Sequence, residues 1–370
     1  MKKLFLPLFV ALLLPMVTKA QQNVTLEQFS AQHQFDTQYA QAEMKYAFED
    51  YKGSVKSWQK KFRKELADLL GITRLQKQYK DFVPTAKQID SEDIGFATRE
   101  RWHIWTEPTM IIPVVIIRPK DLKGPAPLCI TPQGHNANPE AYSGISNDPK
   151  EIKSFETRHG NIAYRIAQKG IITINPTTRG FGLTRHEDDL KKDGRSSCKY
   201  YHQRDIIAGR VIVGDRVWDV MKIIDWALAN LPVDKDRVIV SGNSGGGTVS
   251  IYAGAIDQRI SFCAPSSCFC SYEGSIGTIY HCYCNYVTNI MSLCNMGDLA
   301  GLVAPRKLLI INGAKDDIFP IGPAREEFKT TKAVFKAMGV EENCEMYEGH
   351  AGHRYYIEGF YGFWDRHFAK

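Results

Sequence analysis

The stretch Val238-Ile239-Val240-Ser241-Gly242-Asn243-Ser244-Gly245-Gly246-Gly247-Thr248 determines how the rest of the chain is interpreted. A β-branched run stops at a serine among glycines, and a helix-like segment follows. Gly242-x-Ser244-x-Gly246 matches a nucleophile elbow, in which a serine stands on a sharp strand-to-helix turn. Glycines are needed on both sides because side chains there would collide with the strand and the helix. The alternative is a glycine-rich turn with an incidental serine.

Strands and helices alternate around this elbow. Residues 96–118 predict a pair of antiparallel strands. Further strands are expected at 128–131, 171–175, 237–241, 261–264, 307–311 and 345–347, and helices at 152–169, 213–230, 323–338 and 355–368. This alternation predicts an α/β fold with a mostly parallel central sheet and helices on both faces. Ligands then bind at the carboxyl ends of the strands.

The 370 residues suffice for one large domain and an extension. A basic start, an apolar run over 4–17 and Thr18-Lys19-Ala20 predict a signal peptide over 1–20 and a periplasmic or secreted protein. No cysteine follows that would support a lipid anchor, and no later stretch predicts stable membrane insertion. We expect a helical N-terminal extension over 21–90 and a catalytic domain over 91–370.

The net charge of +6 is mild and spread along the chain. Basic residues do not form a stripe interleaved with aromatic residues, so nucleic acid is not an expected partner. The sequence gives no indication of oligomeric state.

Six of the nine cysteines lie between Cys263 and Cys294, including the Cys-x-Cys pairs 268/270 and 282/284. Three interpretations stand: buried small hydrophobic residues, one or two disulfides, or a metal site. The metal site ranks last, because a second Cys-x-x-Cys half is lacking and only His281 is adjacent. We therefore expect neither a metal nor a cofactor.

Residues 266–300 interrupt the alternation of strands and helices. A lid-like insertion here would overhang the pocket. Its candidate pocket residues are His281, Tyr286 and Tyr272.

A serine nucleophile needs a base, and the base needs an orienting acid. Asp316 follows the strand 307–311, and His353 lies in the last loop of the chain. The order Ser244, Asp316, His353 is that of an α/β-hydrolase triad. Asp317 and His350 are the alternatives within each pair.

Two backbone N–H groups are expected to form the oxyanion hole. One belongs to Gly245, and the other to His135, in the loop after the strand 128–131. The alternative for His135 is a surface loop residue. Arg179 is expected to brace loops, and Asp257 with Arg259 to form a structural pair.

Five segments together resemble the acetyl xylan esterase / cephalosporin-C deacetylase group of α/β-hydrolases. They are Gln133-Gly134-His135-Asn136, Arg179-Gly180-Phe181-Gly182, Gly242 to Gly247, Gly313-x-x-Asp316 and Gly352-His353. The resemblance covers roughly residues 95–370. His281 to Tyr286 and Ile318-Phe319-Pro320-Ile321 are similar to an exported bacterial branch often described as acetyl xylan esterase-like.

This resemblance implies the α/β-hydrolase fold, the triad Ser244, Asp316 and His353, and oxyanion donors at His135 and Gly245. It also implies hydrolysis of small acyl esters, chiefly acetyl esters of carbohydrates or other small molecules. The group usually has His-Gly-Tyr where this chain has Gln133-Gly134-His135, and the 266–300 segment differs from the usual one.

Other functions compete with a deacetylase. Glucuronoyl esterases typically carry an arginine after the serine, where this chain has Gly245. Prolyl-oligopeptidase-type peptidases bring a propeller domain that the N-terminal extension is too short to form. An inactive carbohydrate-binding relative would need a broken triad. A zinc enzyme built on the Cys-x-Cys pairs ranks last.

Overall fold

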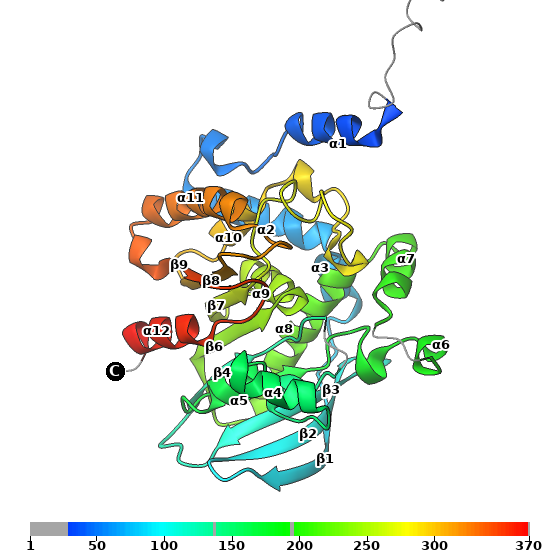
Figure 1. The fold of residues 1–370 in the computed structure, drawn as a ribbon, viewed down its shortest axis with the longest axis vertical. Helices are drawn as coiled ribbons and strands as arrows, with labels where there is room; N and C mark the ends of the chain where they lie inside the picture. The colour runs from blue at the N-terminus through cyan, green and yellow to red at the C-terminus, as the bar shows by residue number, and fades with distance from the viewer. Residues whose placement is uncertain (1–28, 136–137, 193–195, 369–370) are drawn as a thin grey trace, which may run out of the picture. The chain divides into compact units, whose positions relative to one another are not determined.

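The computed structural model describes residues 29–135, 138–192 and 196–368 (Figure 1). The chain divides into two units, residues 1–43 and 44–370. The first contains helix α1 (Ala31–Ala40), whose first turn is capped by the Ser30 hydroxyl. The predicted signal peptide lies outside the described residues. Within the described ranges, no helix combines the length and the apolarity that crossing a membrane requires.

The second unit is built on one nine-stranded sheet with the order β1-β2-β3-β5-β4-β6-β7-β8-β9. The strands are β1 (Ala86–Asp93), β2 (Ala97–Glu107), β3 (Met110–Pro119), β4 (Ala126–Ile130), β5 (Ile172–Pro176), β6 (Val233–Asn243), β7 (Ile260–Ser266), β8 (Lys307–Gly313) and β9 (Cys344–Gly349). Strands β5, β4, β6, β7, β8 and β9 pair in parallel, and β1, β2, β3 and β5 pair antiparallel. The mostly parallel sheet and the β2–β3 hairpin are confirmed.

Strand β1 begins inside the segment 21–90 that the sequence predicted as a helical extension, so that prediction is wrong over residues 86–90. Most of the β1 side chains are exposed. The strand is held by its antiparallel pairing with β2 rather than by burial of an apolar face. It therefore lacks the alternating hydrophobic pattern that would have revealed it.

The helices of this unit are α2 (Val55–Leu69), α3 (Ile72–Gln78), α4 (Pro149–Thr157), α5 (Ile162–Ala167), α6 (Glu187–Leu190), α7 (Cys198–Ala208), α8 (Ile212–Asn230), α9 (Gly245–Ile256), α10 (Met296–Gly301), α11 (Ile321–Ala337) and α12 (Ile357–His367). The prediction of a single helix over 152–169 is wrong, because the helical path is interrupted between α4 and α5. His159 adopts a positive φ of 55° there, which ends the helical path.

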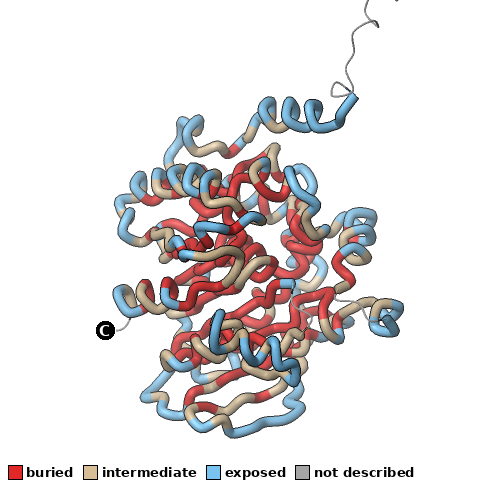
Figure 2. Tube along the Cα trace, in the orientation of Figure 1, coloured by how far each residue is buried: buried red, intermediate tan, exposed pale blue. Residues whose placement is uncertain are grey.

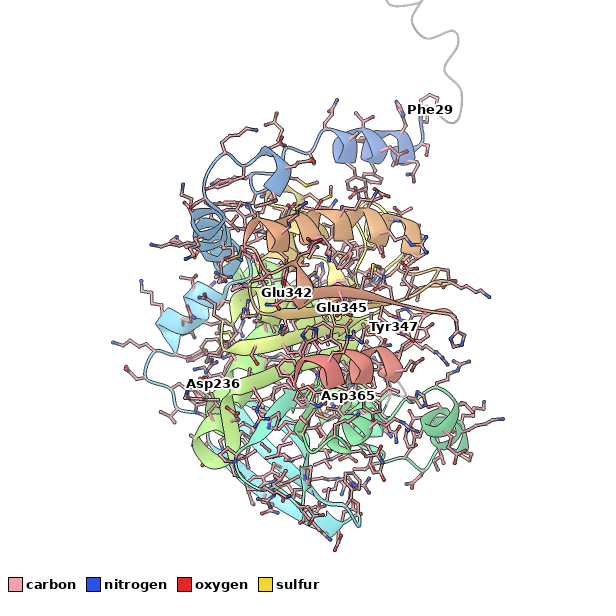
Figure 3. The ribbon with its side chains drawn as sticks, turned by 90° about the vertical axis from the view of Figure 1, so that its left-hand side faces the viewer. Phe29, Asp236, Glu342, Glu345, Tyr347 and Asp365 are labelled. Atoms are coloured by element: carbon pink, nitrogen blue, oxygen red, sulfur yellow. The ribbon has the colours of Figure 1, made fainter. Side chains whose placement is uncertain are left out.

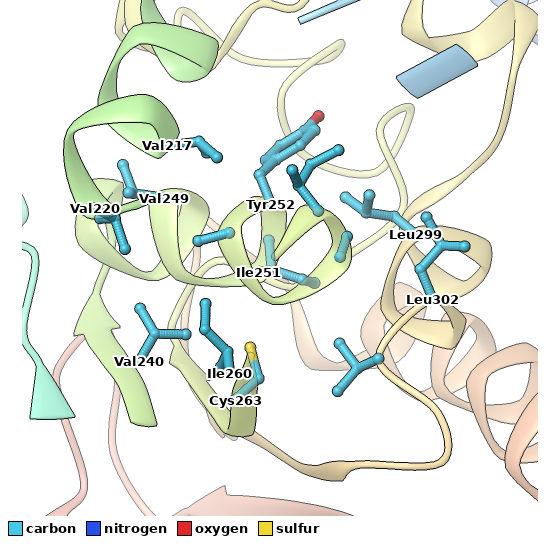
Figure 4. Close-up of a cluster of buried hydrophobic side chains, with 14 of the residues drawn as sticks. Val217, Val220, Val240, Val249, Ile251, Tyr252, Ile260, Cys263, Leu299 and Leu302 are labelled. Carbon is cyan, nitrogen blue, oxygen red and sulfur yellow. The ribbon is translucent and has the colours of Figure 1, made fainter. Parts of the chain in front are cut away.

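Successive residues of the central strands point to opposite faces of the sheet. Val238 and Val240 of β6 pack with α8 and α9 on one face, while Ile239 packs with α5 and α12 on the other. Figure 4 shows the first core, where Val217 of α8 and Leu299 of α10 flank α9. The burial map shows the sheet and the inner sides of its helices as buried (Figure 2). Helices on both faces are thus confirmed.

Helix α2 begins where the Ser54 hydroxyl accepts a hydrogen bond from the Ser57 N–H. Its apolar stripe of Trp58, Phe62 and Leu66 is fully buried in the main core. This part of the N-terminal extension is therefore integral to the second unit.

The edge strand β9 carries Glu345 and Tyr347 (Figure 3). Glu345 forms an ion pair with Arg366, and its other carboxylate oxygen lies 3.4 Å from His367 Nε2, both at the end of α12. Charged side chains on an edge strand disfavour pairing of its free backbone N–H and C=O groups with another chain.

Residues 266–300 are largely core rather than lid. Cys268, Cys270, Tyr272 and Cys294 are buried in the main hydrophobic cluster, and α10 packs against α11. Only the stretch around 279–282 lies at a pocket. The small and apolar side chains of this segment fill space above α9, which the aromatic and cysteine content alone did not reveal.

Glu327 of α11 provides a test of pH-dependent stability. Burial raises the pKa of Glu327 to about 7, and the negative charges of Asp298, Glu273 and Glu49 also raise it. The hydrogen bond that Glu327 accepts from the Gly297 N–H lowers it in part. A raised carboxyl pKa stabilises the fold below the unfolded pKa, and this stability is lost as pH rises towards 7. Glu327→Gln keeps an acceptor for Gly297 without the charge. We expect it to stabilise the protein at pH 8 by about 1–2 kcal/mol and to have little effect near pH 4.

Melting temperatures of wild type and Glu327→Gln at pH 4.5, 6 and 8 measure this difference. Glu326→Gln is the matched control, because Glu326 is the neighbouring residue and is exposed. A pH-independent effect of Glu327→Gln, or an equal effect of Glu326→Gln, would contradict the assignment.

Candidate active site

Ser244 stands between β6 and α9 with φ 58° and ψ −122°, a strained conformation for a residue with a side chain. Its N–H donates to the Ser266 carbonyl at the end of β7. A Cβ at Gly242 would lie 2.4 Å from the Pro132 carbonyl oxygen, and a Cβ at Gly246 would lie 2.0 Å from it. The two glycines therefore allow the loop after β4 to pack directly on the turn.

Asp316 and His353 meet at the same edge of the sheet. His353 Nδ1 lies 2.9 Å from Asp316 Oδ2, and the Asp316 side chain is fully buried. The other carboxylate oxygen accepts the N–H groups of Ile318 and Phe319, which fixes its orientation. A Cβ at Gly313 would lie 2.4 Å from the carbonyl oxygen of Gly352, so the glycine lets the two loops approach.

The alternatives within each pair lie elsewhere. Asp317 is exposed beside the buried Asp316. His350 is also exposed, and its ring packs edge-on to Tyr356 with 6.1 Å between centroids. Among these four side chains, the structure brings Asp316 and His353 together.

The loop after β4 lies against the elbow. A Cβ at Gly134 would come within 2.6 Å of the Asn243 carbonyl oxygen and 3.2 Å of the Ser244 Cβ. The Gly134 N–H donates to the Tyr142 hydroxyl, which holds this loop in place. The imidazole of His135 lies over Gly245, where an added Cβ would be 2.9 Å from its Cε1 atom. A side chain at position 245 would therefore require the His135 ring to move.

A pocket of about 580 Å³ opens at this point. Its lining includes Gly134, His135, Ser244, Ile279, His281 and His353, together with Ser154 and Phe155 of α4, Arg158 at the end of that helix, and Arg354. The structure thus brings the nucleophile candidate, the base candidate and the loop after β4 to one cavity. Sequence reasoning missed the contribution of α4, because amphipathicity does not tell which polar face of a helix borders a cavity.

The three candidate pocket residues of the 266–300 segment have different positions. His281 lines the pocket. Tyr286 lies outside the lining and accepts a hydrogen bond from the His281 N–H through its hydroxyl. Tyr272 is buried in the core, where its hydroxyl is 2.7 Å from that of Tyr252. The expectation for Tyr272 is wrong, because its chain segment packs on α9 below the pocket.

His281 is a neutral imidazole. Burial lowers the pKa of His281 to about 4, and the proximity of His135 and His353 acts in the same direction. The Asn285 amide donates to Nδ1 at 2.9 Å, which leaves the proton on Nε2. This Nε2 is buried and has no hydrogen-bond partner among the described residues. His281 therefore lines the pocket and carries a buried N–H without a partner among the described residues.

Arg179 stabilises the loops around the site through buried ion pairs, as expected. Its buried guanidinium contacts three carboxylates: Glu107 at 2.7 Å, Asp219 at 2.6 Å and Asp215 at 3.2 Å. The neighbouring Thr178 hydroxyl donates to the Gln133 carbonyl in the loop after β4. The expected structural pair of Asp257 and Arg259 is also confirmed, at 2.6 Å.

Comparison with known proteins agrees with this architecture. The model of the Abhydrolase family matches residues 27–273. The Bacillus subtilis (strain 168) protein named "Putative hydrolase YtaP" is 22% identical over 249 residues, which are 65% of this chain and 77% of that protein.

Solved structures share the fold at low identity. A "putative acetyl xylan esterase" from Bacteroides fragilis NCTC 9343 has a TM-score of 0.71 at 17% identity, covering 89% of this chain and 83% of that one. Methylesterase BT1017 has a TM-score of 0.67 at 17% identity, covering 91% and 69%. A glucuronoyl esterase from Teredinibacter turnerae T7901 has a TM-score of 0.61 at 13% identity, covering 89% and 90%.

The family match covers more than half of the chain, and the sheet order and the elbow have the form that the α/β-hydrolase fold requires. The chain belongs to the Abhydrolase family of α/β-hydrolases.

Proposed function

We propose that this protein is a serine carboxylic-ester hydrolase that removes short acyl groups, chiefly acetyl, from carbohydrates or other small molecules. The observation that carries the proposal is the convergence of three groups on one pocket. They are Ser244 on a strained elbow, His353 bonded to a buried Asp316, and the loop after β4.

His353 takes the proton of Ser244 as the hydroxyl attacks the ester carbonyl, and returns it to the leaving alcohol. Asp316 accepts a hydrogen bond from His353 Nδ1, which keeps Nε2 free to act as the base. Water then cleaves the acyl-enzyme by the same route. No step of this mechanism requires a cofactor.

The tetrahedral intermediate places a negative charge on the former carbonyl oxygen. The backbone N–H groups of Gly245 and His135 are the proposed donors to this oxyanion. Each such donor contributes about 3–4 kcal/mol to the transition state in comparable hydrolases.

The steric surroundings of Ser244 support a small acyl group. In its present position the His135 ring contacts Gly245 so closely that an added Cβ would lie 2.9 Å from it, and the ring narrows this side of the nucleophile. The same contact argues against the glucuronoyl esterase alternative, since an arginine after the serine would have to displace the His135 ring. A propeller-bearing peptidase is also disfavoured, because all strands of the described residues belong to one sheet.

The remainder of the pocket supports a polar leaving group. His281 carries a buried Nε2–H, and the charged residues Arg158 and Arg354 also line the pocket. Hydrogen-bond donors in a pocket suit the hydroxyl groups of a sugar. Residues 1–20 support export to the periplasm or the medium, where such glycans are met.

The experiment compares p-nitrophenyl acetate, butyrate and octanoate with acetylated xylan and a methyl ester of glucuronic acid. We expect kcat/KM to fall at least tenfold from acetate to octanoate, and acetate release from the glycan to exceed cleavage of the uronic ester. A preference for octanoate would contradict the small-acyl assignment. Preferential cleavage of the uronic ester would establish the alternative.

A further inference from the structure

Four metal-ligating side chains converge behind the proposed oxyanion loop. His135 Nε2 and the Sγ atoms of Cys198, Cys282 and Cys284 all lie within 4.8 Å of one another. His135 Nε2 is 3.1 Å from Cys284 Sγ, which is 3.4 Å from Cys282 Sγ. They come from three separate segments: the loop after β4, the first residue of α7, and the stretch of 266–300 beside the pocket.

The set and its spacing fit Zn²⁺. Structural zinc sites are tetrahedral, and Cys₃His is one of their common ligand sets. Zn–S bonds of about 2.3 Å and Zn–N bonds of about 2.0 Å require ligand atoms to be about 3.6–3.8 Å apart. The separations in this cluster bracket that range. Four protein ligands fill the coordination sphere, as in a structural rather than a catalytic site.

The charge around the cluster also fits. Three thiolates and Zn²⁺ carry a net charge of −1, and the buried guanidinium of Arg216 donates to Cys198 Sγ at 3.3 Å. In the described parts of the chain, no carboxylate lies within ion-pair distance of Arg216, so its charge faces the sulfurs. The Asn285 amide adds a weak bond to Cys284 Sγ at 3.8 Å. Such surrounding donors are typical of thiolate metal sites.

We propose that His135, Cys198, Cys282 and Cys284 bind one Zn²⁺ ion that fastens the oxyanion loop to α7 and to the pocket stretch around 279–284. The expectation that the chain binds no metal is revised by this proposal. Disulfides account for the cluster less well, because a bond between two sulfurs leaves the third sulfur and the imidazole without a role. Zinc ligation also protects the thiolates from oxidation outside the cytoplasm.

Metal content of the purified full-length protein tests the proposal directly. We expect about one Zn²⁺ per chain by elemental analysis. Replacing the ion by Co²⁺ should give the visible absorption of tetrahedral thiolate-bound cobalt. Cys282→Ser removes one ligand and should weaken Zn²⁺ binding by more than about 100-fold. Replacing a residue that only hydrogen-bonds to a ligand typically weakens metal binding by about 10–100-fold. Cys270→Ser is the matched control, taken from the other Cys-x-Cys pair, and should bind like wild type.

Two results would overturn the site. One is wild-type protein that holds no Zn²⁺ after equilibration with the metal and a reductant. The other is a purified protein whose mass and peptide map show a disulfide between Cys198 and Cys282 or Cys284. Because wild type is measured directly, neither result depends on whether the variant folds.

The effect on turnover rests on the proposed function and is measured separately. Removal of Zn²⁺ by a chelator should lower kcat for p-nitrophenyl acetate by about tenfold or more, because the His135 N–H loses its anchor, and added Zn²⁺ should restore it. Unchanged kcat in the zinc-free protein would refute the positioning role. Ser244→Ala should bind Zn²⁺ like wild type, so failure of the esterase proposal and failure of the zinc site are distinguishable.

Discussion

Ser244→Ala is expected to lower kcat/KM for p-nitrophenyl acetate by at least about 10⁴-fold. The hydroxyl is the only group proposed to form the acyl-enzyme, and His353 has no proton to accept without it. The remaining backbone donors would support only a small residual rate. Steady-state kinetics and labelling by a serine-directed fluorophosphonate measure the two consequences.

Ser261→Ala is the matched control. Ser261 lies at the start of β7, at the opposite end of the strand from the pocket, and its hydroxyl donates to the Val238 carbonyl. It should keep the wild-type rate and label fully. Equal activity of Ser244→Ala and wild type, or labelling of another residue, would refute the proposed nucleophile.

Arg179→Met is expected to destabilise the fold by about 3–5 kcal/mol. The guanidinium is buried among Glu107, Asp215 and Asp219, and Arg210 is the remaining partner of two of them. Methionine fills a similar volume but leaves three buried carboxylates facing a single cation. Burial alone would raise the pKa of Glu107, but the bonds and charges of the two arginines lower it to about 2.

Urea denaturation at pH 7 measures this loss as a shift of the midpoint at constant slope. Arg325→Met is the control, because Arg325 pairs with Glu348 at an exposed site and should cost less than about 1 kcal/mol. Adding Glu107→Gln to Arg179→Met should recover part of the loss by removing one uncompensated charge. Equal shifts for Arg179→Met and Arg325→Met would show that the network does not stabilise the fold.

Local signals in the sequence sufficed for the parts of the fold that depend on neighbouring residues. The glycines around Ser244, the β-branched runs and the cap at Ser54 each act within a few residues, so strands β2 to β9 and helices α8, α9, α11 and α12 were predictable. The break at His159 was not, because a histidine with positive φ is imposed by its surroundings. Strand β1 was missed because pairing with β2, not its own pattern, forms it.

The candidate site divides in the same way. Chain order and spacing indicated Ser244, Asp316 and His353, and the structure adds the contact that distinguishes His353 from His350. The sulfur cluster could not be assembled from the sequence, since Cys284 is 149 residues from His135 and Cys198 lies alone in its segment. Only the folded sheet brings these positions together.

The position of His353 in the chain bears on truncated forms of the protein. Ser244 and the loop after β4 precede β7 in the chain, whereas the proposed base lies just before α12. In the proposed mechanism, a fragment cut before residue 353 therefore keeps Ser244 but lacks the histidine that takes the proton of its hydroxyl.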